Sequence, residues 1–121
     1  MVTEIIANIL DRLKSTKNQQ EDRIILRLDQ NMACVYRSYN PENYFNQINT
    51  KNIQNIKVVY YRSPRQYDYH VVLKTGSRHQ LLVGNRTHWL SKREAYWLAE
   101  ELSQWLKVPV TEKEVINDIP Y

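Results

Sequence analysis

The chain has 121 residues, a net charge of +4 and a hydrophobic content of 42%. This length suits a single domain, residues 1–121, that buries a modest core without structural metals. The lone cysteine, Cys34, excludes an internal disulfide, and two glycines are too few for the phosphate-binding loops of classical nucleotide-binding proteins. No apolar run approaches the roughly 20 residues that cross a bilayer, and no signal-peptide pattern opens the chain, so we expect a cytoplasmic protein.

The first segment, Val2 to Lys14, predicts an amphipathic helix. Its apolar side chains recur every three or four residues, which is the period of a helix with one buried face. They are Val2, Ile5, Ile6, Ile9, Leu10 and Leu13. A polar connector, residues 15–22, follows this predicted helix.

The middle of the chain predicts an antiparallel sheet of five or more strands. β-Branched and aromatic residues alternate with turn residues there, and Gln30 and Asn31 form the tight connection of the first hairpin. The expected strands are Arg23–Asp29, Met32–Tyr39, Asn55–Arg62, Gln66–Lys74 and Arg78–Val83. Residues 44–55 fit either a short irregular strand or a helical turn.

The register of the last predicted hairpin follows from its apolar residues. If Thr75, Gly76 and Ser77 form the loop, Lys74 faces Arg78 and Leu73 faces His79. This register places five apolar side chains on one face of the sheet. They are Tyr69, Val71, Leu73, Leu81 and Val83.

The strongest local signal is a capped helix from Ser91 to Leu106. Ser91 and Glu94 form a capping box, and Pro109 stops the helix shortly after its end. One stripe of the helix is apolar and consists of Ala95, Leu98, Ala99, Leu102, Trp105 and Leu106. A second box, Thr111 to Glu114, predicts a short terminal turn. The order of helix, strands and helix predicts an α+β domain in which helices cover a curved sheet.

The stretch from Leu81 to Val110 resembles the closing segment of small uncharacterised cyanobacterial proteins. It is also similar to modules appended to some cyanobacterial serine/threonine kinases, in which a last strand leads through an L-S-x-x-E cap into a W-L-A-x-E-L helix that ends in W-L. The matching residues are Leu90, Ser91, Glu94, Trp97, Leu98, Glu101, Leu102, Trp105 and Leu106. The resemblance covers about a quarter of the chain and implies a pleckstrin-homology-like sheet and C-terminal helix. The chain lacks kinase motifs, so the resemblance does not imply kinase activity.

Few residue patterns point to catalysis or metal binding. His70, His79 and His88 recur every nine residues, but His70 and His79 point in opposite directions in the predicted hairpin, so we expect no metal or cofactor site. Cys34 lies in the middle of a predicted strand, where a small packed thiol is the usual role. The neighbouring acids Glu100 and Glu101 point about 100° apart on a helix. We therefore expect a non-enzymatic protein.

Basic residues are concentrated in one part of the chain. Between Lys51 and Arg93 there are nine basic side chains and one acid, Asp68. Successive turns of a meander lie at alternate ends of a sheet, so Lys74 and Arg78 separate from the others. The remaining candidates for an anion-binding rim are Arg62, Arg65, Arg86, Lys92 and Arg93, with Tyr61, Tyr67 or Trp89 able to stack on a base or lie beside a lipid headgroup. The competing interpretation is a solvated basic surface that keeps the sheet soluble.

Trp97 lies about 140° from the centre of the apolar stripe on a helical wheel, so it should not face the sheet. Either the predicted N-terminal helix covers it, or Trp97 anchors a partner protein or a homodimer together with Tyr96 and Trp105. We expect a small binding or adaptor domain with a protein partner. The alternative is a domain that binds nucleic acid or anionic lipid through the basic rim.

Overall fold

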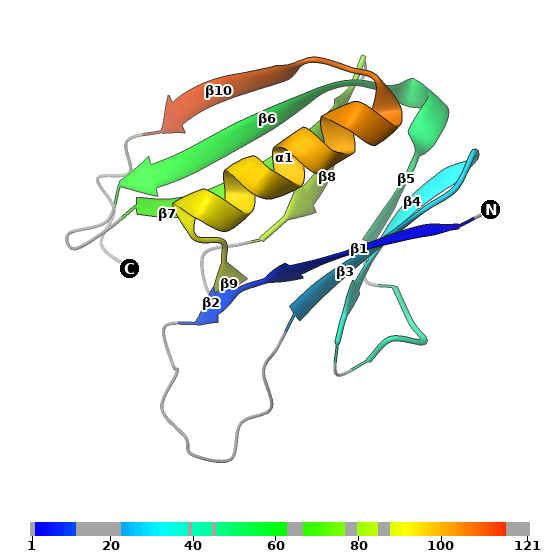
Figure 1. The fold of residues 1–121 in the computed structure, drawn as a ribbon, viewed down its shortest axis with the longest axis horizontal. Coiled ribbons are helices and arrows are strands. Elements are labelled where there is room, and N and C mark those ends of the chain that lie inside the picture. The colour runs from blue at the N-terminus through cyan, green and yellow to red at the C-terminus, as the bar shows by residue number, and fades with distance from the viewer. Residues whose placement is uncertain are drawn as a thin grey trace.

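The computed structural model describes residues 2–11, 23–38, 40–44, 46–62, 67–76, 80–84 and 88–115. Within these ranges, eight strands form two four-stranded sheets, two short strands form a separate pair, and one α-helix contacts both sheets (Figure 1). The predicted α+β class is confirmed. The strands are divided between two sheets, whereas the sequence had suggested one.

The first sheet is antiparallel and has the order β1-β3-β4-β5. Its strands are β1 (Thr3–Asn8), β3 (Arg23–Leu28), β4 (Met32–Arg37) and β5 (Asn46–Asn49). The predicted hairpin about Gln30 and Asn31 is confirmed, and Asp29 fixes its turn by accepting hydrogen bonds from the backbone N–H groups of Asn31 and Met32, both at 2.7 Å. The ambiguous segment, residues 44–55, contains β5 and then a 3-10 turn, η1 (Thr50–Asn52).

The second sheet has the order β10-β6-β7-β8, in which β10 runs parallel to β6 and the other pairs are antiparallel. Its strands are β6 (Ile53–Arg62), β7 (Tyr67–Thr75), β8 (Gln80–Val83) and β10 (Val110–Val115). A short pair, β2 (Leu10–Asp11) with β9 (His88–Trp89), connects the segment after β1 to the segment before α1.

The register of the β7–β8 hairpin differs from the prediction by two residues. Lys74 pairs with Gln80 and Leu73 with Leu81, because the connection is longer than Thr75–Ser77. A shift by two positions returns each side chain to the same face of a strand. The five apolar residues that were predicted to share a face are consequently all buried.

The predicted N-terminal helix is wrong, because Thr3–Asn8 is the edge strand β1. It pairs with β3 from Thr3 opposite Leu28 to Asn8 opposite Arg23. Burial alternates along the strand: Ile5 and Ala7 are buried, whereas Ile6 is 44% exposed. The apolar residues fit a helical period as well, but β-branched isoleucines favour a strand, and pairing with β3 outweighs the local pattern.

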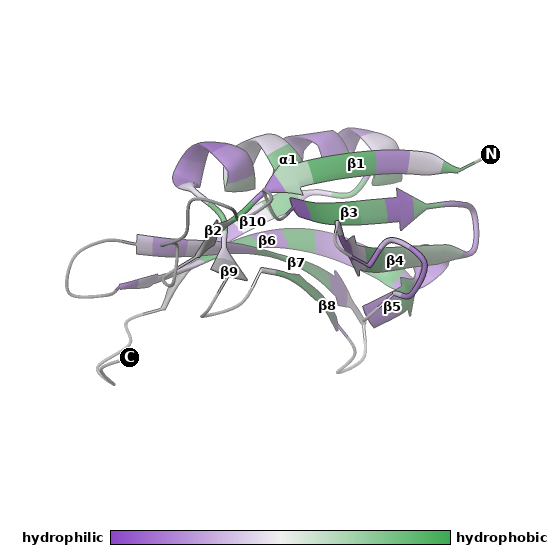
Figure 2. Cartoon of the chain, turned by 90° about the horizontal axis from the view of Figure 1, so that it is seen from below, coloured by the Kyte–Doolittle hydropathy of each residue, from purple (hydrophilic) through white to green (hydrophobic). Residues whose placement is uncertain are grey.

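The predicted C-terminal helix is present as α1 (Lys92–Leu106). The Ser91 side chain accepts a hydrogen bond from the Glu94 N–H at 3.1 Å, as the capping box predicts. Four side chains, Ala95, Leu98, Ala99 and Leu102, form its buried stripe. The helix packs on β6 and β7 and also contacts β1 and β10. Figure 2 shows α1 and β1 together along the upper side of the molecule.

The predicted terminal turn at Thr111–Glu114 is also wrong, since these residues lie in β10. The helix ends at Lys107, which adopts a left-handed conformation with φ of 58° and redirects the chain. The Ile56 N–H then donates to the Pro109 carbonyl at 3.0 Å, which begins the parallel pairing of β10 with β6. A capping-box pattern of four residues also occurs in extended segments. Here residues 111–114 form a strand and not a helical turn, because they pair with the edge of β6.

The buried side chains form one continuous core between the two sheets and α1. The inward-facing residues of β3, β6, β7 and β8 contribute most of the fully buried large side chains, and α1 adds Leu98 and Leu102. The helix therefore closes one side of the sandwich.

The alternation along β1 predicts unequal effects of two neighbouring substitutions. Ile5→Ala should lower the free energy of unfolding by roughly 2–4 kcal/mol because it leaves a cavity in the core, whereas Ile6→Ala should cost about 1 kcal/mol or less. Urea unfolding followed by circular dichroism measures both. Equal losses would contradict the strand, because a helix with the predicted stripe buries both residues.

Candidate functional site

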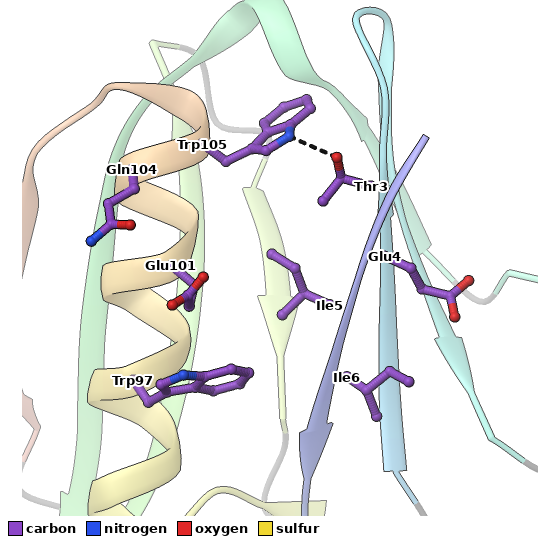
Figure 3. A pocket seen from close by; sticks show the side chains of 8 residues that line it. All are labelled: Thr3, Glu4, Ile5, Ile6, Trp97, Glu101, Gln104 and Trp105. Carbon is purple, nitrogen blue, oxygen red and sulfur yellow. Dashed lines mark hydrogen bonds between the residues drawn. The ribbon is translucent and has the colours of Figure 1, made fainter. Parts of the chain in front are cut away.

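An open groove of about 430 Å³ lies between α1 and β1 (Figure 3). Its size falls within the range of ligand-binding clefts. One wall is the helix and the other is the edge strand of the first sheet. The lining residues are Thr3, Glu4, Ile5, Ile6, Trp97, Glu101, Gln104 and Trp105.

The four helical residues of the groove form a single stripe. At about 100° per residue, Trp97, Glu101, Gln104 and Trp105 fall within an arc of about 100°. This stripe lies beside the buried stripe of α1, so the packing of the helix on β6 and β7 turns it toward β1. The arrangement explains why Trp97 does not enter the core even though α1 is firmly packed.

Side-chain hydrogen bonds connect α1 to β1 near both ends of the strand. At one end, Trp105 Nε1 donates to Thr3 Oγ1 at 2.9 Å, and Figure 3 shows this bond at the mouth of the groove. At the other end, Asn8 Nδ2 donates to Glu94 Oε1 at 3.4 Å. The two contacts hold the helix and the strand at a set separation, so the groove is formed before anything binds.

Two apolar residues in the described lining of the groove are exposed: Trp97, 42% exposed, and Ile6, 44% exposed. The first of our two interpretations of Trp97, a core position under an N-terminal helix, is wrong because that helix is a strand. In Figure 3 the indole of Trp97 extends from the helix toward β1, whereas Ile6 points away from it. An exposed indole beside an open strand edge resembles the aromatic anchors of protein interfaces.

The two charged residues in the described lining of the groove are acids, Glu4 and Glu101, and in Figure 3 the Glu4 side chain points away from α1. Glu4 forms an exposed ion pair with Arg27, with 2.9 Å between Glu4 Oε2 and Arg27 Nε. The hydrogen bond to Glu4 is also the main cause of the raised pKa of Arg27, whose guanidinium lies 4.3 Å from the centre of the Tyr36 ring. Glu101 lies on the opposite wall and is exposed. An exposed pair such as Glu4–Arg27 adds little stability, so the acidity of the groove is not a requirement of the fold.

Tyr96, which we had grouped with Trp97 and Trp105, lies on the other flank of α1. Its ring centroid is 6.2 Å from that of Tyr69, which in turn stacks on Tyr60 at 5.2 Å. Residues 96 and 105 are about 180° apart on a helical wheel, so they cannot face one partner. Burial, followed by the hydrogen bond with Glu112 of β10, raises the pKa of the Tyr96 phenol. Tyr96 therefore helps to hold β10 and is not part of the groove.

The raised pKa of Tyr96 predicts a loss of stability at high pH. A phenol that ionises less readily in the folded state stabilises it fully below the ordinary tyrosine pKa of about 10, and this contribution is lost as the pH rises further. We expect Tyr96→Phe to reduce the fall in the free energy of unfolding between about pH 9 and about pH 11. Tyr44→Phe, at an exposed tyrosine, should leave the fall unchanged. Identical pH profiles for wild type and Tyr96→Phe would contradict this role.

Three of the five residues predicted for the basic rim lie in described segments. Arg62 ends β6, Lys92 and Arg93 begin α1, and all three are exposed. The end of β6 and the start of α1 lie at the same end of the molecule in Figure 1, whereas Lys74 lies toward the opposite end of β7. Arg65 and Arg86 fall outside the described residues. Of the predicted stacking partners, Tyr67 is 44% exposed, Tyr61 is half-buried and Trp89 is buried.

Two of the residues considered for metal binding, Cys34 and His70, lie in different sheets. Cys34 lies on β4 in the first sheet, where burial raises the pKa of its thiol, and His70 is buried on β7 in the second sheet. His79 lies outside the described residues. Among the residues that the structure does describe, no group of three or more His, Cys, Asp or Glu side chains is arranged to hold a metal ion.

Sequence reasoning identified the tryptophans of the groove but missed its opposite wall. Thr3, Glu4, Ile5 and Ile6 were placed on a helix, and Glu101 was treated only as one of two neighbouring acids. The spacing of Trp97, Glu101 and Trp105 at intervals of four was the available signal, because it places them on one helical stripe. No local pattern indicates that a strand from the start of the chain faces this stripe.

Comparisons of the chain with models of known protein families, with curated proteins and with solved structures found no match. None of the helices in the described part of the chain is long and apolar enough to cross a membrane. The geometry of the groove therefore carries the functional argument.

Proposed function

We propose that the chain is a non-enzymatic binding domain that docks a protein partner in the groove between α1 and β1. The exposed indole of Trp97 is the observation that carries the proposal. A large aromatic group that remains 42% exposed, in a groove braced near both ends by hydrogen bonds, is suited to bury area against a partner at little entropic cost. Glu101 is the carboxylate on the helical wall of the groove, whereas Glu4 points away from α1 and pairs with Arg27, and a single exposed carboxylate supports recognition more than catalysis.

We also propose that the fold is pleckstrin-homology-like, as the resemblance of Leu81–Val110 implies. The order of the elements supports this: a meander of β1, β3, β4 and β5 precedes a meander of β6, β7 and β8, and a helix follows. The parallel strand β10 is an addition to that plan.

Substitution of Trp97 tests the docking role. Trp97→Ala should leave the melting temperature within about 2 °C of wild type, because the indole is largely outside the core, and should weaken partner capture about tenfold or more. Val110→Ala is the matched control, since Val110 is 40% exposed on β10, away from the groove. Affinity capture from nuclease-treated native lysate, quantified by mass spectrometry, measures the effect. Equal capture by both variants would contradict the proposal, and a large loss of stability in Trp97→Ala would assign the residue a structural role.

An anionic ligand is the second candidate, because Arg62, Lys92 and Arg93 are exposed cations on segments that meet at one end of the molecule. Binding of this kind should weaken steeply with salt, because cations released from a nucleic acid or an anionic surface drive it. Titrations against single-stranded RNA, duplex DNA and anionic vesicles should show binding that is lost in a variant with all three residues changed to alanine. Flat responses in all three titrations would remove this candidate.

A further inference from the structure

One edge of β1 is open beside the groove. β1 is the first strand in the order β1-β3-β4-β5, so among the described strands it is paired on its β3 side alone. The hydrogen bond from Ser38 N–H to the Arg23 carbonyl at 2.9 Å shows that Arg23 and every second residue after it on β3 bond to β4. The residues between them therefore bond to Thr3, Ile5 and Ala7 of β1.

The alternate residues of β1 consequently direct their backbone groups away from the sheet. Glu4, Ile6 and Asn8 each present an N–H and a C=O to the open side. Within the described part of the chain, none of these six groups has a backbone hydrogen-bond partner. Glu4 and Ile6 also line the groove, so the unpaired edge and the cavity are one surface.

The other flank of α1 shows that a strand fits beside this helix. There β10 pairs with the edge of β6, from Val110 opposite Ile56 to Val115 opposite Tyr61, and contacts α1. The helix therefore has an added strand on one side and an open edge on the other (Figure 1). The open edge offers the same type of backbone pairing that β10 uses, and unpaired edges of this kind are known docking sites for extended peptides.

The spacing of the residues on the helical wall of the groove predicts which side chains such a peptide carries. Trp97 and Glu101 are one helical turn apart, which is about 6 Å along the axis. Two side chains on the same face of a strand are separated by about 6.8 Å, so residues i and i+2 of a peptide match that spacing. One would place an apolar group against the Trp97 indole and the other a cation at Glu101. Of the two charged residues in the described lining, Glu4 points away from α1 in Figure 3 and pairs with Arg27, so Glu101 on the helical wall is the carboxylate that favours a basic side chain.

On the basis of the protein-binding function proposed above, we propose that the groove takes an extended peptide segment of a partner protein. The segment pairs with the open edge of β1 and carries an apolar residue and a Lys or Arg separated by one position. A second copy of this chain fits less well, because its β1, TEIIAN, offers an acid and no base to the acidic groove. We therefore expect the isolated protein to be monomeric in sedimentation experiments.

The test uses fluorescence polarisation with a pair of nine-residue peptides rich in serine and threonine. One carries Leu-Thr-Arg at its centre and the other Leu-Thr-Glu. The wild-type protein should bind the basic peptide about tenfold or more tightly than the acidic one, and Glu101→Lys should reverse this preference. The exposure of Glu101 makes the reversal independent of folding. An unchanged preference in Glu101→Lys would overturn the assigned contact, and failure of the wild type to bind either peptide would overturn the inference.

Backbone pairing is tested by a proline at residue 6. The N–H of Ile6 points to the open side, so Ile6→Pro removes no hydrogen bond to β3 but blocks an added strand, and it should weaken peptide binding about tenfold or more. Ile6→Ala, which keeps the N–H and removes a side chain that points away from α1 in Figure 3, is the matched comparison, and equal losses of binding in Ile6→Ala and Ile6→Pro would overturn the role of the N–H. A second measurement does not depend on how Ile6→Pro folds. Backbone nitrogens of the peptide are methylated either at the odd or at the even positions, and only the set whose N–H groups face β1 should weaken binding when methylated.

The outcomes separate this inference from the proposed function. Binding that survives both Ile6→Pro and backbone methylation but is lost in Trp97→Ala would overturn strand pairing and leave the groove as a docking site. Binding that survives Trp97→Ala would overturn the proposed function. A wild-type dimer that Ile6→Pro converts to a monomer would overturn the partner peptide in favour of a second copy of the chain.

Discussion

The packing of the α1 stripe on the second sheet is the constraint on which the rest of the structure depends. Ala95, Leu98, Ala99 and Leu102 are buried almost completely, and this fixes the rotation of the helix about its axis. Once that rotation is set, Tyr96 must face the β10 flank and the stripe from Trp97 to Trp105 must face β1. The two alanines matter because their small side chains let the helix approach the sheet closely. The groove is thus a consequence of core packing and requires no special local conformation.

Elements whose signals are local could be predicted from the sequence. Three such features depend on residues within a few positions of one another. They are the helix cap at Ser91, the turn after Asp29 and the strand faces of the β7–β8 hairpin. The two terminal segments could not be predicted in this way. The apolar residues of β1 satisfy a helical and an alternating pattern together, and β10 carries a capping-box pattern, but each segment lies against a strand edge that is distant in the sequence. Hydrogen bonding to such an edge outweighs a weak local preference.

The candidate site was predictable only on its helical side. A helical wheel places Trp97 outside the core and, if applied to all three aromatic residues, already separates Tyr96 from Trp105. The contact between Trp105 and Thr3 joins residues 102 positions apart, and no spacing rule reports such a pair. Similarly, the pairing of β3 with β4 determines which alternate residues of β1 direct their backbone groups to the open side. This property of β1 therefore exists only once the whole sheet is assembled.

The strand edges on the two flanks of α1 differ, because the edge of β6 is paired with β10 and β1 is the edge strand of the first sheet. The edge of β6 is paired with β10, which follows α1 directly in the chain, and the rings of Tyr60, Tyr69 and Tyr96 connect β6 and β7 to the helix. The edge of β1 faces Trp97 and Glu101 of α1, and the side-chain contacts of Trp105 and Asn8 hold the helix beside it. Unprotected edges invite pairing between identical chains, and like charges directly opposite each other weaken such pairing. In a pair of identical chains, Glu4 of one copy would meet Glu101 of the other, whereas a segment that carries a base would bring opposite charges together, and this difference is the physical basis of the peptide proposed above.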